Sequence, residues 1–252
     1  MLRYKNIYFV WNVVVTLFIH VLVTAHATEL PSYIHPCGRK DPNYDQCVLD
    51  NINSLKSKIC TGMPEFNIPP IDIIAVDKIT VFDTDNLKLF WKDVKLTGFC
   101  EVSINFVRAD PDKLHFNISA VLKNLRMDCL YDFDIRILLS IAHSGSSTIT
   151  LDEVGLEINM DLKVATKNSE KQIYASKVNT NVNVIKFEYK INNIGNESAQ
   201  VLQILNEFVN NNKQVLLNNV VSVLEKEISK KIIFTFNSIT HSNYEKLFPE
   251  KA

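Results

Sequence analysis

The spacing of apolar residues changes twice along the chain, and each change predicts a different element. Between residues 45 and 59 the apolar positions recur every three or four residues, as on one face of an amphipathic helix. The members of this face are Val48, Ile52, Leu55 and Ile59. Gly62 and Pro64 follow them, so we expect the helix to end there.

From about residue 73 to residue 191 the apolar period is two, which is typical of strands with one buried face. The clearest inward positions are Cys100, Val102, Ile104 and Phe106, then Leu114, Phe116, Ile118, Ala120 and Leu122, then Leu125, Met127, Cys129, Tyr131, Phe133, Ile135 and Ile137. Several of these runs exceed the usual strand length of about 5–6 residues. Long alternating strands of this kind predict a large, strongly twisted and curved antiparallel sheet.

After residue 198 the period returns to that of a helix and continues to about residue 233. The apolar stripe consists of Val201, Leu205, Phe208, Val209, Leu216, Val220, Leu224, Ile228 and Ile232. The run Asn210–Asn212 lowers helix propensity in the middle of this segment, where a bend is expected. The simplest α+β architecture lays this long C-terminal helix in the trough of the curved sheet.

The first 27 residues have the pattern of a secretory signal peptide: a positive start, an apolar run and the Ala25–Ala27 cleavage signature. A membrane anchor is the alternative, and polar Asn12 and His20 within the apolar run disfavour it. We therefore predict a signal peptide at 1–27 and a single domain at 28–252. The mature protein is expected to be secreted and extracellular, without stable membrane insertion.

Charge and motifs exclude several classes of function. The formal net charge of the chain is −1, without the basic stripe that nucleic acid requires. Neither an H-E-x-x-H metal motif, a G-x-S-x-G elbow nor a P-loop occurs, so we expect no metal, no cofactor and no catalysis. His143 beside Ser144 could suggest an esterase, but without the elbow a solvated hairpin loop is the preferred interpretation.

Three blocks of sequence resemble the insect takeout and juvenile hormone-binding protein family. LPSYIHPC and GMPEFNIPP resemble its opening block, YDFDIRILLSIAHSGSSTITL its central strands, and FVNNN with YEKLFPE its end. In the central block His143 stands where the family commonly has a glycine. The resemblance implies a TULIP-like fold, in which a highly curved sheet wraps a long helix around an elongated hydrophobic tunnel.

The resemblance also implies a function. It indicates a secreted carrier, present in haemolymph or a similar fluid, that binds a juvenile-hormone-like terpenoid or a fatty-acid-like lipid in the tunnel. The alternative is an extracellular regulatory protein of the takeout type, with a circadian, feeding or behavioural output through a protein receptor. Tyr131 is the expected polar anchor for a ligand. The expected tunnel walls are Val102, Ile104, Phe106, Phe116, Ile118, Tyr131, Phe133, Ile137, Leu205, Phe208, Leu216, Val220 and Leu224.

The chain has five cysteines, and the family pairs the residues that match Cys37 and Cys47. A bridge from Cys100 to Cys129 is not expected, because the predicted hairpin register holds them about 26 Å apart. We therefore predict free thiols at Cys60, Cys100 and Cys129. The two N-x-S sequons, at Asn117 and Asn196, are predicted to be exposed and open to glycosylation.

Overall fold

The computed structural model describes residues 30–136, 140–167, 170–192, 199–240 and 244–251. All the helices and strands below lie within one compact unit, Tyr33–Ala252. The predicted signal peptide, together with Ile137 and Asn196, lies outside the described residues.

Strands and helices follow the order that the apolar periods predict. The helices are α2 (Tyr44–Thr61), α3 (Ala199–Asn211), α4 (Lys213–Thr240) and α5 (Tyr244–Leu247), with short 3₁₀ turns η1 (Pro64–Phe66) and η2 (Phe99–Glu101). The strands are β1 (Ile73–Asp83), β2 (Leu87–Thr97), β3 (Ser103–Asp110), β4 (His115–Leu122), β5 (Leu125–Arg136), β6 (Ser140–Lys167) and β7 (Glu170–Asn192).

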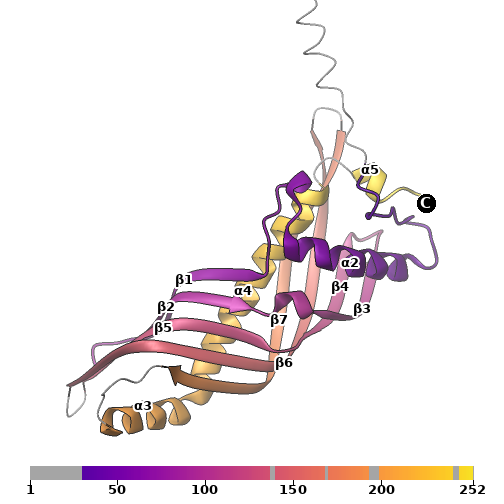
Figure 1. Cartoon of the computed structure of the whole chain (residues 1–252). Helices are drawn as coiled ribbons and strands as arrows, with labels where there is room; N and C mark the ends of the chain where they lie inside the picture. Colours follow the sequence, from indigo (N-terminus) through magenta and orange to yellow (C-terminus); the bar gives the residue numbers. More distant parts are fainter. Residues whose placement is uncertain (1–29, 137–139, 168–169, 193–198, 241–243, 252) are drawn as a thin grey trace, which may run out of the picture. The chain divides into compact units, whose positions relative to one another are not determined.

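One antiparallel sheet, in the order β1-β2-β5-β6-β4-β3, contains these strands, and β7 pairs with β6 (Figure 1). The 28-residue strand β6 joins the two parts of the sheet. It pairs first with β5, up to Leu151, and then with β4, from Val154 onward. Between these two stretches Glu153 adopts a left-handed φ of 54°. The sheet is therefore organised as two groups of strands, β1-β2-β5 and β3-β4, along one long strand.

Helix α4 packs against β7, and polar side chains fix it to the strand's free edge. Glu225 Oε1 accepts the Val182 amide at 3.1 Å, and Asn237 Oδ1 accepts the Ala175 amide at 2.7 Å. Thr240 Oγ1 donates to the Ile173 carbonyl at 2.9 Å. These bonds occupy backbone groups that would otherwise lie open for edge pairing.

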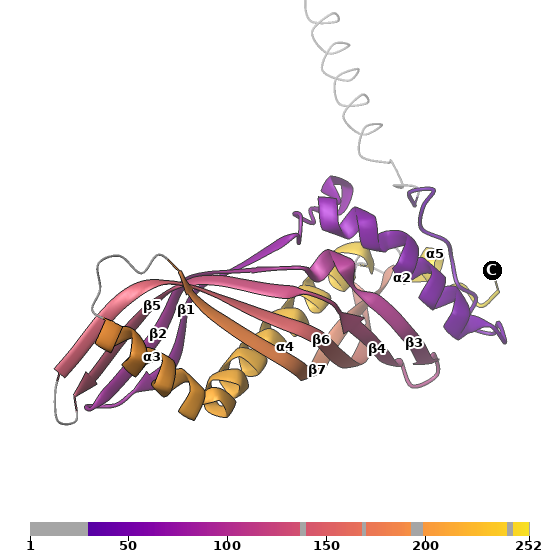
Figure 2. The same cartoon turned by 60° about the horizontal axis from the view of Figure 1, so that its bottom comes forward.

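The C-terminal helix is divided in two rather than continuous. It breaks at Asn212, within the asparagine run that the sequence marks as a weak point, and α4 then extends to Thr240. The Asn212 side-chain amide donates to the Phe208 carbonyl at 2.8 Å, which competes with the regular helical hydrogen bonds. The prediction of a weakened centre is confirmed, and the break makes α3 a separate element (Figure 2).

Two disulfides hold α2 at its opposite ends. Cys37–Cys47 joins the preceding segment to the start of the helix, as the family resemblance implies. Cys60 at the other end pairs with Cys100 in η2, with Cα atoms 5.7 Å apart. The prediction that Cys60 and Cys100 are free thiols is therefore wrong. The strand register excludes only Cys129 as the partner of Cys100, whereas Cys60 comes from a helix that packs beside η2. Cys129 is free and buried.

A bulge in β3 makes the prediction of an inward Phe106 wrong. The pairing with β4 shifts between Ile104 and Phe106, which brings Val107 to the buried face. Phe106 is thereby turned to the other face, where the Arg108 guanidinium lies 4.9 Å from its ring centroid. Strict alternation from Ile104 predicted Phe106 as inward, and the extra residue of the bulge reverses that phase.

Candidate functional site

The apolar core consists of two clusters, and a cavity of about 300 Å³ lies where they meet. The cavity is partly open to solvent and is not an enclosed void. The cavity reaches the lower end of the range for small-molecule sites, about 300–1,000 Å³. Its lining residues are Ile52, Leu55, Ile59, Ile71, Ile74, Phe99, Val102, Ile104, Ile118, Ala120, Leu122, Leu156, Ile158, Met160, Ile228, Lys231, Ile232, Thr235, Phe236 and Ile239.

The floor of this cavity is the inner face of β4 and β6, whose contributing side chains are buried. Its roof is α2, which packs on β3 (Figure 2). Ile52, Leu55 and Ile59 line the cavity and are only half-buried. The apolar face of α2 thus borders open space instead of a filled core, and the two disulfides hold this roof in place.

Lys231 and Thr235 are the two polar side chains in this lining, and both come from α4. They lie four residues apart, so they share one face of the helix. Both are half-buried, at the border of the helix's apolar stripe. Every other lining side chain is apolar. The cavity therefore suits a largely apolar molecule with one polar end.

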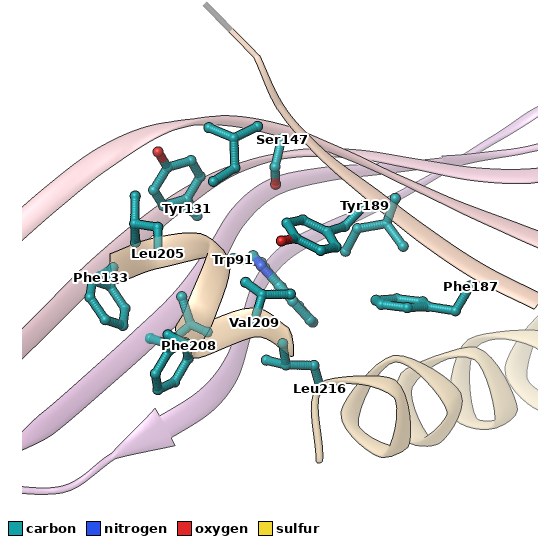
Figure 3. A pocket seen from close by; sticks show the side chains of 13 residues that line it. Trp91, Tyr131, Phe133, Ser147, Phe187, Tyr189, Leu205, Phe208, Val209 and Leu216 are labelled. Carbon is teal, nitrogen blue, oxygen red and sulfur yellow. The ribbon is translucent and has the colours of Figure 1, made fainter. Parts of the chain in front are cut away.

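A second, smaller cavity of about 50 Å³ lies between α3, the start of α4 and the strands β2, β5, β6 and β7 (Figure 3). Phe208 of α3 closes one side, with its ring centroid 4.9 Å from that of Phe133. The Tyr189 hydroxyl donates to Asn206 at 2.9 Å, and burial raises the pKa of Tyr189. A cavity of about 50 Å³ is too small for a ligand unless the surrounding side chains move.

Tyr131 lies at this smaller cavity, and its hydroxyl contacts His143 instead of opening to a ligand. The two residues are joined by a 2.8 Å hydrogen bond to His143 Nδ1, and their rings stack at 5.6 Å. Tyr131 faces Gly145 across the strand pair, where an added Cβ would lie 2.8 Å from its hydroxyl. The prediction of a solvated loop at His143 is wrong: β6 begins at Ser140, so His143 and Ser144 lie within a strand.

The expected wall residues are distributed between different parts of the interior. Val102, Ile104 and Ile118 line the larger cavity. The residues that line the smaller cavity are Tyr131, Phe133, Leu205, Phe208 and Leu216. Phe116 lies in the cluster beside Tyr44, with ring centroids 6.4 Å apart.

Two further expected wall residues occupy the space between the cavities. Val220 and Leu224 are 1% and 0% exposed, on the part of α4 between the lining segments of the two cavities. Their side chains belong to the packed core in this arrangement. A single continuous tunnel is therefore not present among the described residues.

The sequence predicts neither the roof nor the polar end of the larger cavity. The apolar period of α2 predicts a buried helix face, but it does not show what that face covers. Lys231 interrupts the α4 stripe between Ile228 and Ile232, and this charged residue beside apolar positions was the available signal.

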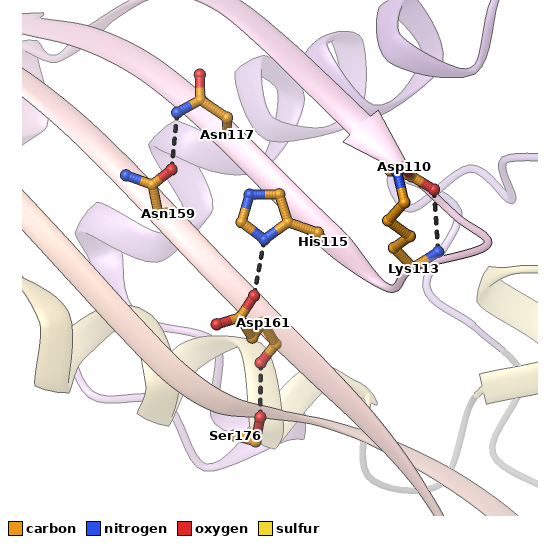
Figure 4. A network of polar contacts seen from close by, with 7 residues as sticks. All are labelled: Asp110, Lys113, His115, Asn117, Asn159, Asp161 and Ser176. Carbon is orange, nitrogen blue, oxygen red and sulfur yellow. Dashed lines mark hydrogen bonds and ion pairs between the residues drawn. The ribbon is translucent and has the colours of Figure 1, made fainter.

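The outer face of β4 and β6 carries a row of polar contacts (Figure 4). His115 Nδ1 lies 2.7 Å from an Asp161 carboxylate oxygen, and the Asn117 amide donates to Asn159 at 3.0 Å. At the adjoining turn, the hydrogen bond from Lys113 lowers the pKa of Asp110. Asn117 is on the polar face, as predicted, but it is half-buried and hydrogen-bonded instead of fully exposed.

Among the residues that the structure describes, no helix is both long and apolar enough to span a bilayer. Within the same residues, no group of three or more His, Cys, Asp or Glu side chains is placed to hold a metal ion.

The fold is that of an α+β protein with one long helix on a curved antiparallel sheet, and a takeout protein of known structure shares it. The crystal structure of Epiphyas postvittana Takeout 1 matches with a TM-score of 0.65 and 18% identity, over 82% of this chain and 97% of that chain. A lipopolysaccharide binding protein matches at a TM-score of 0.40 and 14% identity, over 78% of this chain and 38% of that chain. No curated protein sequence matches the chain.

The family model described as haemolymph juvenile hormone binding protein matches residues 13–249. The chain therefore belongs to this family, together with the takeout proteins that it resembles in sequence and fold.

Proposed function

We propose that this protein is a secreted carrier that binds a small hydrophobic ligand in the cavity between α2, the β4–β6 floor and α4. The observation that carries the proposal is the apolar cavity of about 300 Å³ at the junction of two packed clusters. Burial of an apolar ligand there would gain about 25 cal/mol per Å² of apolar surface removed from water. The proposed ligands are juvenile-hormone-like terpenoids, which the family description supports, and fatty-acid-like lipids.

The elongated tunnel implied by the family resemblance would join the two cavities past Val220 and Leu224. Both side chains are fully packed, so a ligand that spans both cavities has to displace them. A ligand confined to the larger cavity needs no such movement. We therefore assign primary binding to the larger cavity and regard the smaller one as its extension for longer ligands.

Secretion is part of the same proposal. The two disulfides fit an oxidising compartment, and the N-terminal pattern fits export. Glycosylation at Asn117 and Asn196 would follow from export. Enzymatic activity forms no part of the proposal, because its binding site is lined by aliphatic and aromatic side chains with only Lys231 and Thr235 as polar members.

The regulatory alternative, acting through a protein receptor, has weaker support. It calls for a filled interior together with an apolar patch on the surface. The larger cavity is open, and α2 presents its apolar face to that cavity. Ligand binding could still change how the protein meets a receptor, but the interior itself favours a carrier.

Occlusion of the cavity from its roof tests the proposal. Leu55→Trp would place a large ring in the cavity, whereas Ser57→Trp adds the same ring on the exposed side of α2. The mature protein and both variants would be purified from a eukaryotic secretory host and titrated with the uncharged fluorescent reporter N-phenyl-naphthylamine, with co-purified molecules identified by native mass spectrometry. We expect the wild-type protein and Ser57→Trp to bind and Leu55→Trp to lose binding. Failure of the wild-type protein to bind any apolar molecule would contradict the proposal.

A further inference from the structure

Lys231 is a cation at the wall of an otherwise apolar cavity. Its side chain lines the cavity of about 300 Å³ and is half-buried. A charged amine beside apolar walls loses part of its hydration, and such groups in proteins are normally paired with an opposite charge. Among the described residues, no carboxylate lies within 4.0 Å of the Lys231 amine, and Lys231 has no hydrogen-bond partner there.

The neighbouring lysine gives a direct contrast. Lys230 is exposed and its amine pairs with Glu227 at 2.7 Å. Five residues before Lys230, Glu225 accepts a hydrogen bond from the Val182 amide of β7. Glu227 therefore pairs with Lys230, and Glu225 binds the edge of β7. Neither carboxylate pairs with Lys231, which lines the cavity.

We propose that Lys231, assisted by Thr235, binds the carboxylate of an apolar acid whose chain occupies the cavity under α2. This inference rests on the proposed carrier function and narrows its ligand class to acids such as fatty acids. A site of this kind should bind the acid more tightly than the corresponding neutral ester or alcohol. The lysine supplies the opposite charge, and the remaining lining supplies apolar contact for the chain.

The positions of the two polar residues fit a carboxylate. Residues four apart on a helix have Cβ atoms about 5–6 Å apart, so both side chains reach one small polar group. The ammonium would donate a charge-assisted hydrogen bond to one carboxylate oxygen, and the Thr235 hydroxyl would donate to the other. An ester carbonyl accepts hydrogen bonds without bringing a charge, so it compensates the amine less well.

The lining of the cavity also sets the orientation of the bound acid. The polar end would lie at α4, beside Lys231 and Thr235, and the chain would extend between the α2 roof and the β4–β6 floor. Ile118, Ala120 and Ile158 form part of this floor and are all buried. A carboxylate buried against any other part of this lining would face only apolar side chains, which is costly for a charge.

Competition between an acid and its ester tests the inference. The protein is loaded with N-phenyl-naphthylamine, which is uncharged, and the reporter is displaced with dodecanoic acid, methyl dodecanoate or dodecanol. For the wild-type protein we expect the acid to displace the reporter about tenfold better than the ester, the margin of one hydrogen bond to a charged group. Lys231→Met keeps the length of the side chain and removes the charge, so its preference for the acid should disappear while ester binding persists.

Two further variants control for charge and for folding. Lys230→Met removes a positive charge from the adjacent, exposed position and should retain the preference for the acid. Lys231→Arg preserves the charge and should retain the preference as well, which a general loss of structure would not allow. Equal displacement by acid and ester, or an unchanged preference in Lys231→Met, would overturn the inference and leave the carrier proposal intact. If no reporter binds to the wild-type protein, the carrier proposal fails and the inference fails with it.

Discussion

Removal of the Cys60–Cys100 disulfide should destabilise the protein by an amount set by the loop that it closes. The bridge spans 40 residues, whereas Cys37–Cys47 spans only 10. In the chain-entropy model, loops of these lengths correspond to about 4 and about 2.7 kcal/mol. Cys60 and Cys100 are both half-buried, so their replacement by alanine leaves little additional cavity. The lost cross-link is therefore the main expected effect.

The assay is equilibrium unfolding in urea, followed by the fluorescence of the buried Trp91. Cys60→Ala, Cys100→Ala and the double variant should each lose about 4 kcal/mol, because either single change already removes the whole cross-link. The midpoint should fall, and the slope with urea should increase, because the unfolded chain exposes more surface without the cross-link. Losses of the two single variants that add up in the double variant, or a double-variant loss below about 1 kcal/mol, would refute this reasoning.

Three further predictions concern other parts of the fold. Glu225→Ala should destabilise the protein by about 1–3 kcal/mol and speed hydrogen exchange at the Val182 amide, while Glu225→Gln keeps the acceptor oxygen and should do neither. Gly145→Ala should force the Tyr131 ring aside and cost about 1–3 kcal/mol in thermal or urea unfolding; unchanged stability would mean that the ring moves freely. Burial raises the pKa of the Cys129 thiol from 9.0 to about 11, so the folded state retains a proton that the unfolded state loses in this range. Stability should therefore decrease from pH 9 to pH 11, and by less in Cys129→Ala; equal decreases in both proteins would contradict the assignment.

The main elements of the fold could be predicted from the sequence because each has a clear period. Alternation from Phe116 to Leu122 and from Leu125 to Phe133 gives the buried faces of β4 and β5 as observed. The asparagine run marks the point where α3 and α4 separate. These features depend on local pattern, which the sequence contains directly.

The features that could not be predicted depend on contacts between distant segments. Phe106 is turned outward by a single extra residue in β3, and alternation alone cannot locate a bulge. Cys60 meets Cys100 only because the end of α2 reaches η2. The apolar face of α2 looks the same whether it covers a packed core or open space. The size of the cavity and the position of Lys231 in its lining therefore required the structure.

A crystal structure of the protein with dodecanoic acid would locate both ends of the ligand. We expect electron density for the acyl chain between α2 and the β4–β6 floor, with the carboxylate within hydrogen-bond distance of the Lys231 amine. The smaller cavity beside Phe208 should remain closed for an acid of this length. Density at the smaller cavity alone, or a cavity under α2 refilled by its own side chains, would contradict the account.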